Sequence, residues 1–129
     1  MIVRASLDEV MTWAATAAQA AEAKGGEDTV ILDVGPLLSV TDAFIITSGS
    51  NTRQVRTIVD EVEEQVKTVG GPAPLRIEGL DDATWVLMDY GDFIVHVFST
   101  EARAFYGLEG LWADAGHWEW HAAAPAGID

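Results

Sequence analysis

The chain has 129 residues, no cysteine, and 21 acidic against 7 basic residues, which gives a formal net charge of −14. This length suits one domain, and 49% hydrophobic residues are too many for a disordered chain. The acidic excess argues against a nucleic-acid binder that grips phosphates, and the absence of cysteine excludes disulfides and thiolate metal sites.

The first predicted element is a helix that begins after Ser6. Ser6 and Glu9 have the spacing of a capping box, and an alanine-rich stretch follows up to Gly25. Two runs rich in β-branched residues come next, at residues 29–34 and 43–47, and turn-forming residues follow each run. The pattern therefore predicts a helix followed by two strands.

The strongest helical pattern follows the turn at residues 48–51. Its apolar residues are spaced so that they form one stripe along a helix. The members of this stripe are Val55, Ile58, Val59, Val62, Val66 and Val69. Because most of them are β-branched, burial rather than intrinsic propensity must stabilise this helix.

A short alternating run at residues 75–78 precedes two strand-like runs, 84–90 and 93–98, which only Gly91 and Asp92 separate. This spacing predicts a tight hairpin, and a two-residue loop fixes which face each side chain occupies. One predicted face is wholly apolar, with the pairs Tyr90–Phe93, Met88–Val95 and Val86–Val97. The second face mixes apolar and polar groups, with the pairs Asp89–Ile94, Leu87–His96 and Trp85–Phe98.

The second face of the hairpin has two possible fates. Only two substantial helices are predicted, and if both cover the apolar face, the second face stays partly open. An open aromatic face rimmed by polar groups is typical of a protein-interaction surface. Alternatively, the last helix or the tail folds back over it, and the sequence leaves both possibilities open.

The end of the chain changes character twice. Residues 100–112 have the pattern of a short helix and turn, interrupted by Gly107 and Gly110. From about Gly116 onward the periodicity is lost. We therefore expect one domain over residues 1–115 and an irregular C-terminal tail over residues 116–129.

Two histidine patterns could carry chemistry, although a structural role is favoured for both. Asp89 and His96 lie diagonally on the second hairpin face and could form an acid–base pair, but no nucleophile stands beside them. His117 and His121 are four residues apart, but Glu119 does not directly follow the first histidine, as the zinc-protease pattern requires. We expect no metal and no cofactor.

The turn at Gly49 and Ser50 lies between a strand and a helix, where nucleotidyltransferase-type folds hold a phosphate. Those enzymes also need two carboxylates at alternate positions on the next strand, so that both reach the same metal ions. The next strand here offers Glu78, with Arg76 in place of the second acid. A helix cap is therefore favoured over a catalytic role for this turn.

Three segments occur in a distinctive order. They are TDAFIITSGS running into TRQV within residues 41–55, EG at 78–79 followed by WVLMDYGDFIVHVF at 85–98, and EAR, FY, LE and LW between 101 and 112. Together they resemble the ribosomal silencing factor, or Iojap-like, family, over a match from about residue 28 to 115. The tail from Gly116 matches nothing that we expect of the family.

The resemblance implies a single α/β domain with a mixed sheet of about five strands and two main helices. It implies a nucleotidyltransferase-like fold without the catalytic carboxylate pair, and a protein that is not an enzyme. It also implies binding to the large ribosomal subunit through its fourteenth protein, with little RNA contact, so that joining of the small subunit is sterically blocked and translation is repressed.

The implied partner-binding surface draws on the hairpin and on the segment after it. Its candidate residues are Trp85, Asp89, Tyr90, His96, Phe98, Tyr106 and Trp112. The hairpin register places Tyr90 on the opposite face, so it is also a candidate core residue. Gly107 and Gly110 replace helix formers of the family at about 1 kcal/mol each, so the last helix is expected to be short or broken and a basic contact to be lost.

Two other functions remain open from the sequence. One is a nucleotide-binding enzyme of the nucleotidyltransferase type that uses Gly49, Ser50, Glu78 and Asp89. The other is a generic adaptor whose hairpin face binds a different protein.

The chain is expected to be a soluble cytoplasmic protein. Its apolar runs fall short of the roughly 20 residues of a membrane span, and its first residues lack the pattern of a signal peptide. An uncovered sheet face or edge would permit a homodimer of the free protein.

Overall fold

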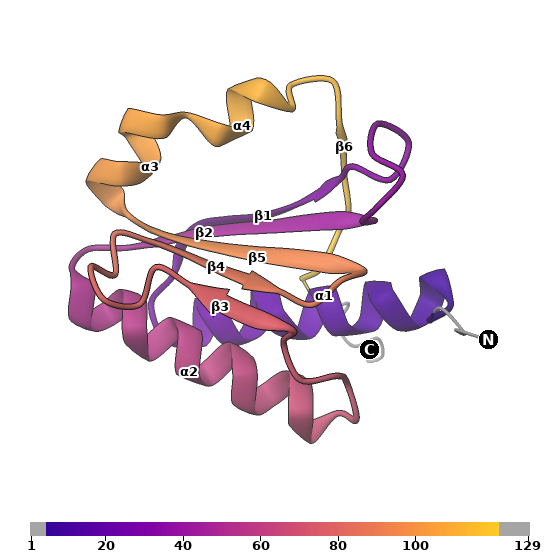
Figure 1. Cartoon of the computed structure of the whole chain (residues 1–129), viewed down its shortest axis with the longest axis horizontal. Helices are drawn as coiled ribbons and strands as arrows, with labels where there is room; N and C mark the ends of the chain where they lie inside the picture. Colours follow the sequence, from indigo (N-terminus) through magenta and orange to yellow (C-terminus); the bar gives the residue numbers. More distant parts are fainter. Residues whose placement is uncertain (1–4, 122–129) are drawn as a thin grey trace.

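The computed structural model describes residues 5–121 as one sheet between two helical layers (Figure 1). The elements are α1 (Leu7–Ala23), β1 (Glu27–Asp33), β2 (Ala43–Gly49), α2 (Thr52–Thr68), β3 (Arg76–Glu78), β4 (Trp85–Asp89), β5 (Phe93–Ser99), α3 (Thr100–Tyr106), α4 (Leu108–Leu111) and β6 (Gly116–His117). None of these helices is long and apolar enough to cross a membrane.

The sheet is mixed, and its strands are ordered β3-β4-β5-β2-β1-β6. The central strands β2 and β5 are parallel, and the other neighbouring pairs are antiparallel. The single α/β domain with a mixed sheet is therefore confirmed. The expectation of about five strands falls short by β6, which the sequence pattern did not reveal.

The two long helices cover one face of the sheet, as expected (Figure 1). The Ser6–Glu9 capping box begins α1, and Asn51 caps α2. Alanines of α1 such as Ala14 and Ala18 are fully buried, so that α1 lies close to α2 and the strands. The predicted stripe of α2 is buried in the same core, except that Val69 caps the C-terminus of α2 and is 47% exposed.

The hairpin forms with the predicted register. The apolar face packs in the main core, where Met88 pairs with Val95 and Val86 with Val97. On the second face, Trp85 pairs with Phe98, Leu87 with His96 and Asp89 with Ile94. Both faces of the predicted hairpin are therefore confirmed.

The second face of the sheet is largely covered, which decides between the two fates left open by the sequence. After β5 the chain turns back over the sheet as α3 and α4 (Figure 1). A second core forms beneath them, and its buried members are Leu32, Val34, Phe44, Ile46 and Phe98. The helix is broken as expected, because Gly107 ends α3 in the left-handed conformation at φ 56°.

The beginning of the expected tail is not irregular. Gly116 and His117 form β6 along the outer edge of β1, and the Trp118 N–H then donates to the Ile31 carbonyl at 2.9 Å. Trp120 is buried in the main core on the α1 side of the sheet. We call residues 116–121 the C-terminal strap; residues 122–129 of the expected tail lie outside the described residues.

Candidate functional site

Three aromatic side chains form a partly exposed cluster where α3 meets β4. Tyr106 packs on Trp85 with ring centroids 4.8 Å apart, and Phe105 packs on Tyr106 at 5.0 Å. Phe105 is 82% exposed and Tyr106 is 51% exposed, whereas Trp85 is half-buried. We call Trp85, Phe105 and Tyr106 the aromatic patch.

The aromatic patch lies beside two hollows that each carry a carboxylate. A hollow of about 330 Å³ is lined by Glu78, Gly79, Trp85 and Leu87. A second, of about 270 Å³, is lined by Thr84, Ser99, Glu101, Ala102, Phe105 and Tyr106. An apolar surface with acidic groups at its rim suits a partner that presents apolar and basic side chains.

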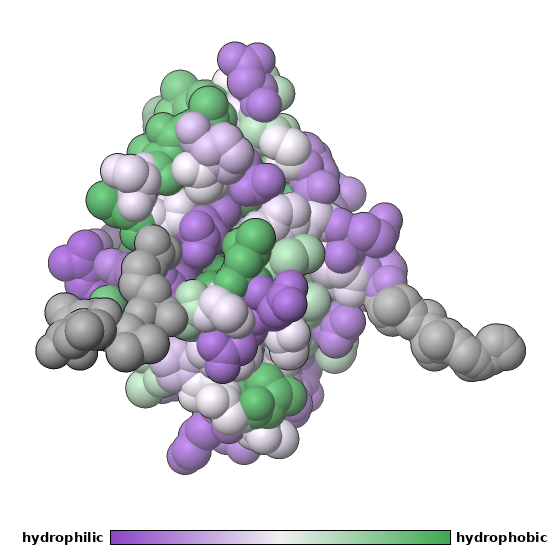
Figure 2. Space-filling model, turned by 90° about the vertical axis from the view of Figure 1, so that its right-hand side faces the viewer, coloured by the Kyte–Doolittle hydropathy of each residue, from purple (hydrophilic) through white to green (hydrophobic). Residues whose placement is uncertain are grey.

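Apolar side chains are also exposed toward the other end of the α3–α4 layer. They are Leu111 of α4 and, in the loop between β1 and β2, Leu37 and Val40. Figure 2 shows the end of the molecule that carries this loop, with hydrophobic residues gathered in its upper part, on the α3–α4 side of the sheet. Exposed apolar area of this kind marks interaction surfaces.

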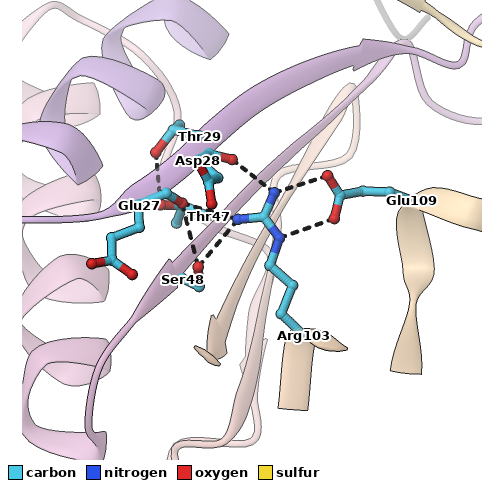
Figure 3. A network of polar contacts seen from close by, with 7 residues as sticks. All are labelled: Glu27, Asp28, Thr29, Thr47, Ser48, Arg103 and Glu109. Carbon is cyan, nitrogen blue, oxygen red and sulfur yellow. Dashed lines mark hydrogen bonds and ion pairs between the residues drawn. The ribbon is translucent and has the colours of Figure 1, made fainter. Parts of the chain in front are cut away.

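Arg103 holds the α3–α4 layer on the sheet (Figure 3). Its guanidinium donates two parallel hydrogen bonds to the Glu109 carboxylate, at 2.9 and 2.8 Å. The same group donates to the carbonyls of Glu27 and Asp28, at 2.9 and 2.7 Å, and to the Ser48 hydroxyl at 3.2 Å. One side chain of α3 therefore ties α4, β1 and β2 together.

The sequence of β1 creates the site that Arg103 fills. The ladder with β2 is irregular between Glu27 and Val30, and Asp28 adopts a left-handed conformation at φ 50°. Such a bulge leaves backbone groups outside the ladder. The guanidinium donates hydrogen bonds to two of these carbonyls. Its hydrogen bonds to Glu109 hold the pKa of that carboxyl below its ordinary value.

His96 lies at the centre of a chain of aromatic contacts across the covered face. Trp112, which caps the C-terminus of α4, packs edge-on against Phe44 of β2, and Phe44 packs edge-on against His96 of β5. The Trp85 Nε1–H donates to Nδ1 of His96 at 3.1 Å, and Trp85 in turn contacts Tyr106. The two short helices are thus linked through buried rings.

Two of the binding residues predicted on the second hairpin face are not accessible to a partner in this structure. Phe98 is fully buried in the second core, and His96 is only 4% exposed. The prediction assumed an open face, whereas α3 and α4 cover these positions. In this structure His96 and Phe98 therefore present no surface to a partner, and their direct contact with one stays a prediction.

Burial lowers the pKa of His96 to about 4. The neutral imidazole is therefore the folded form, while the unfolded chain takes up a proton near pH 6.5. The contribution of the neutral imidazole to the free energy of unfolding is fully present above pH 6.5. This contribution is lost as the pH falls toward the pKa of His96 in the folded protein. The cost between pH 7 and pH 5 is about 2 kcal/mol, at roughly 1.4 kcal/mol for each pKa unit.

The pH effect is measurable by urea unfolding of the wild type and of His96→Phe at pH 7, 6 and 5. The wild type is expected to lose about 2 kcal/mol more than the variant over this range, because the variant has no buried imidazole to protonate. Parallel losses in both proteins would contradict the assignment. His117 and His121 are present in both proteins and cancel in the comparison.

Asp89 and Tyr90 have structural partners. The Asp89 carboxylate accepts the Gly91 N–H at 2.8 Å and forms an ion pair with Arg76, while His96 is bonded to Trp85 instead. Tyr90 is buried and stacks on Phe93, so its alternative placement in the core is correct. Burial raises the pKa of the Tyr90 hydroxyl, and the charge of Glu63 raises it further.

The remaining predicted residues, Tyr106 and Trp112, belong to the covering layer. Tyr106 is exposed in the aromatic patch, whereas Trp112 is half-buried and packs against the second core. Sequence reasoning missed Phe105 and Leu111 as exposed apolar residues, and Arg103 as the residue that positions α3. The adjacent aromatics at 105 and 106 were a usable signal, because neighbouring residues cannot face the same way on a helix.

The turn at Gly49 and Ser50 is filled by a side chain of the protein itself. Gln54 accepts the Ser50 N–H at 2.6 Å and the Ser50 hydroxyl at 2.9 Å, and it donates to the carbonyls of Lys24 and Gly25. A Cβ at Gly49 would lie 3.2 Å from the Gln54 side chain, so Gln54 packs closely against this glycine. This arrangement is a helix start, as the sequence favoured.

Neither acidic nor histidine clusters among residues 5–121 assemble a metal site. No group of three or more His, Asp or Glu side chains in that part of the chain could hold an ion. Arg76 forms ion pairs with both Glu78 and Asp89, at 3.2 and 3.4 Å. His121 lies against Glu22 and Glu119, at 3.5 and 3.4 Å.

A sequence profile described as "Ribosomal silencing factor during starvation" matches residues 7–126. The matched region is longer than expected at both ends and includes the C-terminal strap, so the expectation that residues from Gly116 match nothing is wrong. The motifs at 41–55, 78–98 and 101–112 all lie within it.

Similar proteins carry related names. The chain is 41% identical over 99 residues to "Ribosomal silencing factor RsfS" of Bacillus subtilis, covering 77% of this chain and 83% of that protein. It is 32% identical over 92 residues to "Mitochondrial assembly of ribosomal large subunit protein 1" of Mus musculus, covering 69% and 40%. A crystal structure of a Chromobacterium violaceum protein matches with a TM-score of 0.77 at 29% identity, covering 92% of this chain and 96% of that one.

Proposed function

Because the chain belongs to the ribosomal silencing factor family, we propose that it binds the large ribosomal subunit through the fourteenth protein of that subunit. Bound there, it sterically prevents the small subunit from joining and so represses translation in the cytoplasm. Membership of the family is the observation that carries this proposal. The mouse relative, whose name refers to assembly of the ribosomal large subunit, supports the same subunit as the target.

The aromatic patch is the surface that we assign to this contact. It combines a half-buried tryptophan with two exposed aromatic rings, a composition enriched at the energetic centres of protein interfaces. Its rim carries Glu78 and Glu101. A basic ribosomal protein fits such a surface better than RNA does.

Charge supports a contact to protein rather than to RNA. The net charge is −14, and three of the seven basic residues, Arg56, Arg76 and Arg103, are engaged in internal contacts. Few cations are therefore left to neutralise phosphates. The acidic field would speed the approach to a basic protein, and this steering weakens as salt is added.

We also propose that the protein is not an enzyme. Gln54 occupies the turn where a nucleotidyltransferase-type fold would hold a phosphate. Arg76 stands between Glu78 and Asp89 and pairs with both. A charge-neutralised acidic pair with a cation between its members is poorly arranged to bind magnesium. Kinship with nucleotidyltransferases and a homodimer of the free protein both stay predictions.

The test is a subunit-joining assay with purified large and small subunits on sucrose gradients. A molar excess of the protein is expected to reduce the joined fraction and to sediment with the large subunit. Phe105→Ser is expected to weaken binding about tenfold, because it removes an exposed aromatic contact. Leu7→Gln alters an exposed apolar residue on the opposite layer and serves as the matched control.

The outcomes are separable. An unchanged joined fraction at saturating wild-type protein would overturn the proposed function. Equal binding by Phe105→Ser and Leu7→Gln would instead leave the function and remove the aromatic patch from the contact.

A further inference from the structure

We propose that His96 is a positioning residue that fixes the indole of Trp85 in the orientation presented to the partner. The proposal rests on the proposed function, since the partner is the large ribosomal subunit. It also replaces our expectation that His96 contacts the partner itself, because His96 is 4% exposed.

Ring stacking alone does not fix the direction of the Trp85 indole. The ring lies against Phe98, with centroids 4.9 Å apart, and against Tyr106 at 4.8 Å. An indole that lay in the same plane with its N–H edge pointing in another direction would keep both contacts. The reason is that stacking depends little on the direction in which the N–H edge points. A directional bond is needed to select one orientation.

The hydrogen bond to His96 supplies that direction. Trp85 Nε1 has one N–H, and it donates to Nδ1 of His96 at 3.1 Å. An indole turned over would leave its N–H away from this acceptor. The bond therefore selects the edge of Trp85 that faces the hollow lined by Glu78, Gly79 and Leu87.

The surroundings of His96 hold the acceptor rigidly and at a cost to stability. Phe44 packs edge-on against the imidazole at 4.9 Å, and Phe98 lies nearly parallel to it at 6.3 Å. Nδ1 accepts, so the neutral ring carries its proton on Nε2, and Nε2 is buried without a partner among the described residues. An apolar ring would avoid this unpaired donor.

A stability cost of this kind indicates a function for the polar atom. Nδ1 has a partner on the proposed binding surface, while Nε2 has none within residues 5–121. The bond to Trp85 is therefore what the imidazole provides that phenylalanine could not.

The test compares two variants that separate the acceptor from the ring. His96→Phe keeps an aromatic ring and removes the acceptor. His96→Asn removes the ring but keeps an acceptor close to the Nδ1 position. Stability should favour the phenylalanine variant, because asparagine leaves unfilled space in the second core.

Binding should follow the opposite order. We expect His96→Phe to bind the large subunit five- to tenfold more weakly than the wild type, and His96→Asn to fall closer to the wild type. In nitrogen-15 spectra, the indole proton of Trp85, identified with Trp85→Phe among five tryptophans, should exchange with water at least tenfold faster in His96→Phe.

Each result has a defined meaning. Wild-type binding and unchanged indole exchange in His96→Phe would overturn the proposal, as would binding that simply follows thermal stability. If the wild type does not bind large subunits, the proposed function fails, and the exchange rate still decides whether His96 fixes Trp85.

Discussion

Replacing Arg103 with leucine is expected to lower the free energy of unfolding by about 3 kcal/mol. The guanidinium is 12% exposed and donates to three elements besides its own helix. Without the guanidinium, the carbonyls of Glu27 and Asp28 lose their hydrogen-bond donor, because a leucine side chain cannot donate a hydrogen bond. It also leaves the Glu109 carboxylate unpaired, although Glu109 is 40% exposed and water recovers part of that cost.

Urea unfolding followed by circular dichroism measures this loss. Arg103→Lys keeps the charge but cannot form the two parallel bonds, and we expect it to lose about half as much. Glu109→Gln should cost about 1 kcal/mol, because it removes only the charge of the exposed partner. A loss below 0.5 kcal/mol in Arg103→Leu, on the order of a typical surface substitution, would show that α3 is held by apolar packing alone.

The loss of Arg103 should also affect binding, through the helix α3 that carries part of the aromatic patch. The aromatic residues Phe105 and Tyr106 lie on the helix that Arg103 ties down. Releasing this helix should therefore weaken large-subunit binding as well as stability. In the folded fraction of Arg103→Leu, amide hydrogen exchange should rise first in residues 100–111 and β1.

Trp120→Ala is expected to destabilise the fold by about 3 kcal/mol. Trp120 is 6% exposed and packs in the main core. Its carbonyl accepts a hydrogen bond from Gln19 of α1 at 2.9 Å. The side chain therefore anchors the C-terminal strap on the far side of the sheet from α4.

Thermal and urea unfolding of Trp120→Ala should both show the loss, with His121→Ala as the control. His121 stacks on Trp120 at 3.8 Å but is exposed, so its removal should change stability by no more than about 0.5 kcal/mol. Equal effects of the two substitutions would mean that the strap contributes little to the fold. A large effect of Trp120→Ala alone would place the strap within the cooperative unit.

The strap and Arg103 together protect the outer edge of β1. Arg103 covers the carbonyls of Glu27 and Asp28, Trp118 donates to Ile31, and β6 pairs with Leu32 and Asp33. An unpaired edge strand invites pairing with other chains. The other edge, β3, has three residues and carries the charges of Arg76 and Glu78. Both edges of the described sheet thus disfavour strand-to-strand association.

The local elements could be predicted because their signals are contained in short windows. The stripe of α2 follows the helical repeat, and five of its six members are buried. The two-residue loop at Gly91 and Asp92 determined the hairpin register, which the structure reproduces pair by pair. The break of the last helix followed from Gly107, whose left-handed conformation ends α3.

The candidate site was only partly predictable. Trp85 and Tyr106 were identified and lie together, but His96 and Phe98 were assigned to an open surface that α3 and α4 cover. Hairpin register shows which side chains share a face, but it carries no information on what packs above that face. The hydrogen bond from Trp85 to His96 spans two strands and needed the coordinates to be seen.

The sequence by itself determined the α/β class, the hairpin faces, the broken last helix and the family. These features depend on periodicity, turn chemistry and motif order, which short segments of the chain encode. Only the tertiary structure decided that the second face is covered, that Arg103 joins α3 to β1, and that Trp120 returns to the core. Arg103 meets Asp28 across 75 residues, and Gln19 meets Trp120 across 101, and contacts at such separations depend on how the whole chain packs.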